Sequence, residues 1–170
     1  MRVLLLVLLG IAAPAVAQPS GETLQMSIPS DHKQLRDQRD GDLSTTEWRN
    51  ANGQEHLMLT IARGSEIVSP TAQRDGMASN PLMLCTVKPI REGLDNGYRY
   101  ALWAASCQDT NAAGRRREIW SKAIQGREAL YTVRKIFARP PADKDIAKWI
   151  AYLDAVQVCD PQLPNSPCRR

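Results

Sequence analysis

Catalytic residue types are scarce in this 170-residue chain, which contains only two histidines. These residues, His32 and His56, lie in polar stretches without a nucleophile motif nearby, so we expect them on the surface or in loops. No Gly-x-Ser-x-Gly motif is present, and Ser65 follows Gly64 without the second glycine of that motif. The sequence therefore predicts no catalytic residue and a protein that is not an enzyme.

Motifs for nucleotides and metals are missing as well. The chain has no glycine-rich phosphate loop, which makes nucleotide binding an unexpected function. It has no Cys-x-x-Cys spacing, and neither histidine lies near a cysteine in sequence, so zinc is not expected. The acidic stretch around Gly41 has Arg36 and Gln38 where a calcium-binding helix-loop-helix needs carboxylates. We expect no cofactor and no metal.

The chain begins with an apolar leader. Arg2 precedes an uncharged apolar run, and Ala15-Val16-Ala17 fits the small-x-small pattern that signal peptidase cleaves. The run from Val3 to Ala17 contains a proline and is shorter than the roughly 20 residues of a membrane span. We expect a signal peptide over residues 1–17, cleavage after Ala17, and a periplasmic or secreted protein without stable membrane insertion.

The rest of the chain, residues 18–170, has the length of one domain with one core. Its four cysteines predict two disulfides in an oxidising compartment, for which three pairings are possible. Cys159 and Cys168 bracket a proline-rich segment, so a local clasp between them is the economical choice. That choice leaves Cys85 with Cys107, a pair that can bond only if their strands are neighbours.

β-Forming segments come first along the chain and a clear helix comes last. The pattern predicts an α+β fold, with an antiparallel sheet of about five or six strands, a short middle helix and a C-terminal amphipathic helix. Asp143 is the expected cap of the last helix, whose apolar stripe comprises Ile146, Trp149, Ile150 and Leu153. The expected strands are 45–49, 56–64, 82–90, 98–107, 118–125 and 128–138, and the middle helix is 70–79. Residues 18–42 fit no element.

The expected strand 128–138 has apolar residues on both faces. One face combines Lys135 with Tyr131, Val133 and Phe137, and the other combines Arg134 with Leu130, Thr132 and Ile136. Such a pattern indicates that helices or loops cover at least part of each side of the sheet. The four tryptophans are expected mainly in the core: Trp48, Trp103, Trp120 and Trp149.

Three consecutive arginines are the most distinctive polar feature. They follow Ala112-Ala113-Gly114 at an expected hairpin tip, within a region, residues 88–139, that has eleven basic and five acidic side chains. Arginine can bind phosphate or carboxylate bidentately, so this hairpin is our candidate anion-binding surface. The alternative is a solvated turn whose charges discourage edge-to-edge aggregation. The candidate binding residues are Arg115, Arg116, Arg117 and Lys122.

Several strings resemble a family of small exported bacterial proteins. They include "GYRYALWAASC", "KAIQGREALYTVRKIF" and "IAKWIAYLDAVQVCD", which contain a Gly-Tyr/Ala-Leu-Trp/Cys strand, a Lys-x-Ile-Gln-Gly turn and a Val-Cys-Asp tail. The resemblance spans residues 47–168 and implies little about function. More loosely, strands followed by a packing helix are similar to the PsbP-like α/β sandwich of other exported accessory proteins, a likeness of fold that does not establish function.

These observations favour a non-catalytic exported accessory protein that recognises an envelope protein or an anionic envelope component. Nucleic acid is not an expected partner, because the net charge is small and the protein is exported. An inhibitor or immunity protein against a cell-wall-directed enzyme is an alternative, and so is a hydrolase of envelope polymers. A structure with His56 buried beside Glu47 or Glu55 in a concave pocket would overturn the preference for binding in favour of the hydrolase.

Overall fold

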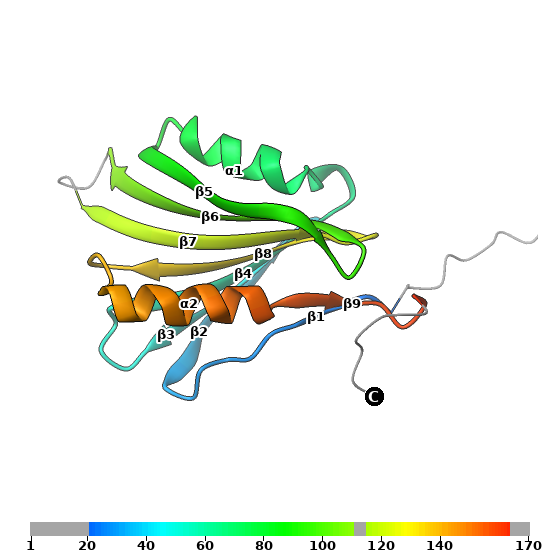
Figure 1. Cartoon of the computed structure of the whole chain (residues 1–170), viewed down its shortest axis with the longest axis horizontal. Helices are drawn as coiled ribbons and strands as arrows, with labels where there is room; N and C mark the ends of the chain where they lie inside the picture. Colours follow the sequence, from blue (N-terminus) through cyan, green and yellow to red (C-terminus); the bar gives the residue numbers. More distant parts are fainter. Residues whose placement is uncertain (1–20, 111–114, 164–170) are drawn as a thin grey trace, which may run out of the picture.

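The structure, a computed structural model, describes residues 21–110 and 115–163. The expected leader, the alanine-glycine tip 112–114 and Cys168 lie outside these residues. Seven strands form one antiparallel sheet in the order β2-β3-β4-β8-β7-β6-β5, and β1 pairs with β9 in a separate two-stranded sheet (Figure 1). The strands are β1 (Thr23–Gln25), β2 (His32–Asp40), β3 (Leu43–Asn50), β4 (Glu55–Arg63), β5 (Met83–Asp95), β6 (Tyr98–Asp109), β7 (Arg116–Gln125), β8 (Ala129–Phe137) and β9 (Gln157–Cys159).

The main sheet has one strand more than expected. The six predicted strands correspond to β3 through β8, and the additional strand is β2, in the segment that the sequence left unassigned. Eight of its nine residues are exposed, so β2 lacks the alternation of buried and exposed residues by which a half-buried strand is recognised. Its partner β3 holds it in place by backbone hydrogen bonds as an edge strand.

Two α-helices and one short 3₁₀ helix, η1 (Gly64–Glu66), complete the described fold. In α1 (Pro70–Ala78) the Ser69 side chain caps the helix by accepting a hydrogen bond from the backbone N–H of Ala72 at 3.0 Å. α2 (Asp143–Ala155) begins without a side-chain cap, because Ala142 occupies the capping position. The predicted cap at Asp143 is therefore wrong, and this carboxylate lies in the first turn, where the helix dipole favours it.

The two α-helices cover opposite faces of the sheet. Side chains on β8 alternate between them: Tyr131 packs in the cluster that contains Leu153 of α2, and Leu130 packs in the cluster that contains Met77 of α1. This confirms the prediction that both faces are covered. Trp103 and Trp149 are fully buried, whereas Trp48 and Trp120 are only partly buried. No helix among residues 21–110 and 115–163 is long and apolar enough to cross a membrane.

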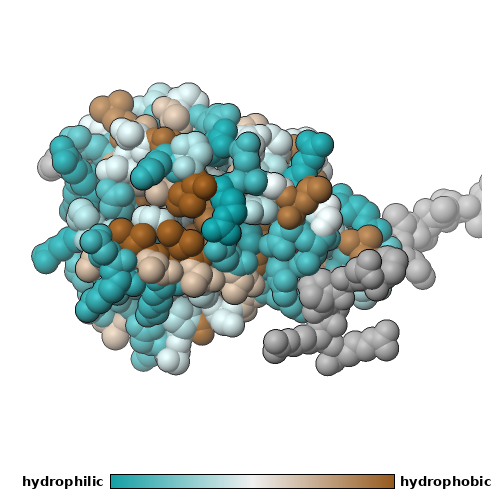
Figure 2. All heavy atoms as spheres, in the orientation of Figure 1, coloured by the Kyte–Doolittle hydropathy of each residue, from teal (hydrophilic) through white to brown (hydrophobic). Residues whose placement is uncertain are grey.

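Figure 2 shows the surface on the side where α2 lies. Hydrophobic residues form short bands there, interrupted by hydrophilic side chains. Leu82, Leu84 and Leu94 are among the most exposed large apolar side chains, and they lie in or beside the edge strand β5. Single exposed leucines of this kind are normal on globular proteins.

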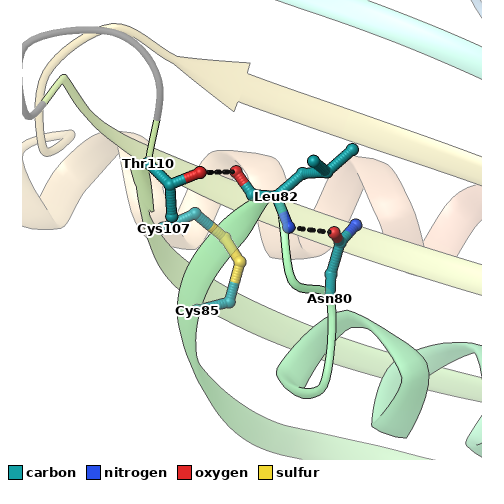
Figure 3. The surroundings of a disulfide bond; sticks show 5 residues. All are labelled: Asn80, Leu82, Cys85, Cys107 and Thr110. Carbon is teal, nitrogen blue, oxygen red and sulfur yellow. Dashed lines mark hydrogen bonds between the residues drawn. A yellow bond between two sulfur atoms is a disulfide. The ribbon is translucent and has the colours of Figure 1, made fainter.

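A disulfide joins the edge strand β5 to β6. Cys85 and Cys107 are direct cross-strand partners with Cα atoms 4.1 Å apart, which confirms the predicted pair (Figure 3). Beside it, the Thr110 hydroxyl donates to the carbonyl oxygen of Leu82 at 2.9 Å. Within the described residues this is one complete disulfide rather than the two expected. Cys159 is also disulfide-bonded, but its predicted partner Cys168 is not among them.

Removing this disulfide should lower the stability of the domain. The bridge closes a loop with a sequence separation of 22 residues, and loop-closure entropy for that length corresponds to about 3 kcal/mol. We expect the Cys85→Ser/Cys107→Ser protein to lose that amount in urea unfolding monitored by circular dichroism. Ser106→Ala on the same strand is the control, and an unchanged urea midpoint for the double variant would contradict the expectation.

Candidate functional site

A cavity of about 970 Å³ opens on the α1 face of the sheet. Its lining comes from α1, from the start of β5 and from two pairs of strands that are far apart in sequence, β3–β4 and β7–β8. The lining includes five arginines and one histidine, but Glu47 is its only carboxylate among the described residues. We call this site the arginine cavity after its five arginines, Arg49, Arg115, Arg116, Arg117 and Arg134.

Among these five arginines, Arg134 is the one that lies on β8, the middle strand of the sheet. Its Nε atom is buried and has no hydrogen-bond partner among the described residues, and no carboxylate of that part of the chain forms an ion pair with it. Burial alone lowers the pKa of its guanidinium group. A buried polar atom without a partner costs free energy, and Arg134 itself lines the cavity, so an anion there would lie against a guanidinium group that has no carboxylate partner among the described residues.

Lys135, the next residue along β8, shows how the chain treats a buried cation on the opposite face. Its Nζ lies 2.7 Å from the Glu55 carboxylate, 2.9 Å from Nε2 of His32 and 3.7 Å from the centre of the Trp149 ring. Burial lowers the pKa of this lysine, and the hydrogen bond and charge of Glu55 oppose that effect. Lys135 is therefore compensated by protein groups, whereas no carboxylate of the described residues forms an ion pair with Arg134.

His32 is buried at the start of β2, contrary to the surface or loop position expected for it. Its Nδ1 lies 2.8 Å from the carboxylate of Asp31 while its other nitrogen contacts Lys135. The Asp31 pKa is lowered, chiefly by the hydrogen bond with this histidine. Sequence could not reveal the contact with Lys135, because the two residues are 103 positions apart.

Lys122 does not belong to the candidate anion-binding surface. It is 2 % exposed and lies on the α2 face, where its Nζ donates to the Asp95 carboxylate at 2.9 Å. It also donates to the carbonyl oxygens of Asp154 and Val156, at the end of α2. The structure corrects the sequence-based assignment: this lysine secures the C-terminal end of α2 and is not available to a ligand.

The three consecutive arginines do reach the cavity. Arg115 and Arg116 are exposed, and the Arg117 guanidinium is held 2.9 Å from the Asp109 carboxylate across the hairpin. The fold adds Arg49 from β3 and Arg134 from β8, which sequence reasoning did not include in the site. The alternation in strand 128–138 had placed Arg134 on the same face as Ile136, but only the sheet order shows that the hairpin shares this face.

A histidine–carboxylate pair lies in the same cavity. Nδ1 of His56 on β4 is 2.7 Å from Oε1 of Glu47 on the neighbouring strand β3. Their side chains are 25 % and 21 % exposed, and the guanidinium of Arg49 lies 3.5 Å from the same carboxylate oxygen. His56 is therefore partly buried on a strand rather than in a surface loop, and it meets the hydrolase condition in its position beside Glu47 in a concave site but not in its burial.

Comparison with known proteins supports the fold. No family model matches the chain, and no curated protein matches it either, so the motif-based resemblance is not confirmed. The chain is similar to the solution structure of cyanobacterial PsbP (CyanoP) from Synechocystis sp. PCC 6803, with a TM-score of 0.57 and 11 % sequence identity. The match covers 86 % of this chain and 98 % of that one. The chain thus has a PsbP-like α+β fold.

Replacing Lys122 should destabilise the protein without affecting anion binding at the cavity. Lys122→Met leaves two carbonyl oxygens and the Asp95 carboxylate without their buried donor, at a cost of about 3 kcal/mol in urea unfolding. Lys88→Met, at an exposed position on β5, is the matched control and should be neutral. If the folded Lys122→Met protein bound pyrophosphate more weakly than the control, the expectation would be contradicted and Lys122 would be part of the binding surface.

Proposed function

We propose that this protein is a non-catalytic exported accessory protein that binds an anionic component of the cell envelope in the arginine cavity. The observation that carries the proposal is Arg134, a cation on the middle strand whose buried Nε has no partner in the described structure. The buried Nε of Arg49 likewise has no hydrogen bond to any residue within 21–110 and 115–163. Hydrogen bonds from arginine to phosphate or carboxylate are stronger than neutral ones, so an anionic ligand gains most where such donors are unused.

The charges around the cavity also suit the capture of an anion from solution. The exposed Arg115 and Arg116 extend the positive charge of Arg49 and Arg134 toward solvent at the hairpin. A concave site lined mainly by one sign of charge attracts ligands of the opposite sign and raises their association rate. Glu47 is the single carboxylate of the described lining, so the net charge around the cavity is positive. A neutral ligand would not gain from this charge.

Export is supported by the cysteines. The Cys85–Cys107 disulfide is typical of proteins in oxidising compartments, and such a bond is rare in the cytosol. With the expected leader, it favours the periplasm or the extracellular space as the place where the anion is met. Envelope components are the anionic molecules that a protein encounters there, either as membrane-associated molecules or as groups on another envelope protein.

Hydrolysis is a second candidate function, favoured by the His56–Glu47 pair. Glu47 fixes the orientation of the imidazole through Nδ1, an arrangement in which Nε2 can accept a proton from water. Arginines in the same cavity could stabilise negative charge that develops on a substrate. No nucleophile motif accompanies the pair, so the attacking group would have to be water.

Binding of a simple anion should depend on Arg134. We expect isothermal titration calorimetry with pyrophosphate at low salt to show binding by the wild type and about tenfold or greater weakening by Arg134→Gln, because a charge-assisted hydrogen bond is lost. Arg99→Gln, which removes the same charge at an exposed position on β6 outside the cavity, is the matched control. Equal weakening in both variants would show only a loss of net charge and would contradict the proposal.

The second candidate predicts turnover that requires the histidine. If the cavity hydrolyses phosphodiesters, the wild type should release nitrophenolate from bis(4-nitrophenyl) phosphate, and His56→Gln should reduce the rate by about a hundredfold, the lower range for loss of a general base. Binding of pyrophosphate by this variant serves as the folding control. Indistinguishable rates for wild type, variant and buffer would remove phosphodiester hydrolysis and leave binding as the function.

A further inference from the structure

The arginine cavity has an apolar floor as well as charged walls. Ile119 on β7 and Ile136 on β8 are direct cross-strand partners on the α1 face. Three methionines complete the floor, and they come from a strand, a helix and the start of the edge strand β5: Met58, Met77 and Met83. Methionine side chains are flexible and polarisable, so they adapt to apolar ligands of irregular shape.

The size of the cavity calls for a ligand that is larger than its charged group alone. Its volume of about 970 Å³ is at the upper end of the range for sites that hold drug-sized organic molecules, and a single phosphate or carboxylate occupies a small part of it. The rest of the ligand must lie against the isoleucines and methionines of the floor. Sugar hydroxyls placed there would lose their hydrogen bonds to water without replacement, so a charged polysaccharide fits poorly.

Gly76 keeps the helical wall of this cavity open. It lies inside α1, where glycine is less favourable than alanine, and a Cβ atom added to it would meet nothing within 4 Å. It lines the cavity beside Met77. A Cβ atom at this position would therefore meet open space at the wall of the cavity.

We infer that the ligand of the arginine cavity is an amphipathic anion, in which a phosphate or carboxylate head binds Arg134 and an alkyl chain lies on the floor of Ile119, Ile136 and the methionines. The inference rests on the proposed function and specifies its ligand. The Arg134 side of the cavity and the isoleucine pair are adjacent, because Arg134 and Ile136 are successive residues on the same face of β8. A head group and the first carbons of its chain can therefore contact both.

A chain-length series tests this inference. Inorganic phosphate, butyl phosphate, octyl phosphate and octanoate are titrated into the purified protein by calorimetry at one ionic strength, below the micellar concentration of each. We expect octyl phosphate to bind at least about tenfold more tightly than butyl phosphate, since each buried methylene contributes about a fourfold gain in affinity. Tighter binding of octyl phosphate or of octanoate identifies the head group as phosphate or carboxylate, and either result supports the inference.

Two variants distinguish binding of the ligand's alkyl chain from binding of its anionic head group. Gly76→Leu should abolish the gain from butyl to octyl phosphate while leaving inorganic phosphate binding unchanged, because it fills the space above the floor and keeps the arginines. Ala78→Leu, at an exposed position of the same helix that does not line the cavity, is the matched control. Because leucine favours a helix more than glycine does, Gly76→Leu should fold at least as stably as the wild type.

The outcomes distinguish this inference from the proposed function. Affinity that depends on Arg134 but not on chain length would overturn the amphipathic ligand and leave the anion site in place. Failure of every anion to bind would overturn both. Binding of the neutral octyl glucoside as tightly as octyl phosphate would show that the cavity takes alkyl chains without need for a charge, which would also overturn the inference.

Discussion

The middle strand β8 imposes the constraint on which the rest of this structure depends, because it carries two successive cations into a covered sheet. Side chains alternate along a strand, so Arg134 and Lys135 must enter opposite faces. Taking either charge out of water costs several kcal/mol unless partners replace the lost hydration. On the α2 face, a carboxylate, an imidazole and an aromatic ring offset this cost for Lys135. The α1 face leaves Arg134 beside a cavity.

The cavity follows from the unequal cover of the α1 face. α1 runs roughly along the strands (Figure 1), so it covers a width of about 10 Å, whereas a sheet of seven strands is about 29 Å wide. The helix contacts β5, β6 and β7, which leaves the inner face of β3, β4 and part of β8 without a helix above it. Arg49, His56 and Arg134 lie on this uncovered part. A short helix on a wide sheet thus creates the hollow, and the side chains around it give it positive charge.

Much of the fold could be predicted from local sequence signals. The turn at Asn96-Gly97 fixed the β5–β6 hairpin, and this hairpin in turn made Cys85 and Cys107 neighbours. β2 was missed because it lacks a buried face, so neither alternation nor hydrophobicity marks it. The apolar neighbours of Lys122 on its own face, Trp120 and Ile124, could have placed it in the core rather than on the hairpin surface.

The candidate site could be predicted only in part, for a physical reason. The arginine run is visible as a string, but Arg49 and Arg134 join it through the order of strands in the sheet, which local patterns do not determine. The same holds for His56 and Glu47, whose contact depends on the register between β3 and β4. A shift of one residue in that register would turn one of the two side chains to the other face. The PsbP-like fold agrees with the strand order and does not specify the ligand.

The central claim is that Arg134, a partly buried cation whose Nε has no hydrogen-bond partner among the described residues, binds an anion. Nuclear magnetic resonance of the arginine Nε–Hε groups tests it most directly, because each side chain gives its own signal. Titration with octyl phosphate should move the Nε–Hε signals of Arg134 and Arg49 strongly, and that of Arg99, on the outside of β6, very little. Saturable shifts at Arg99 with none at Arg134 would contradict the account.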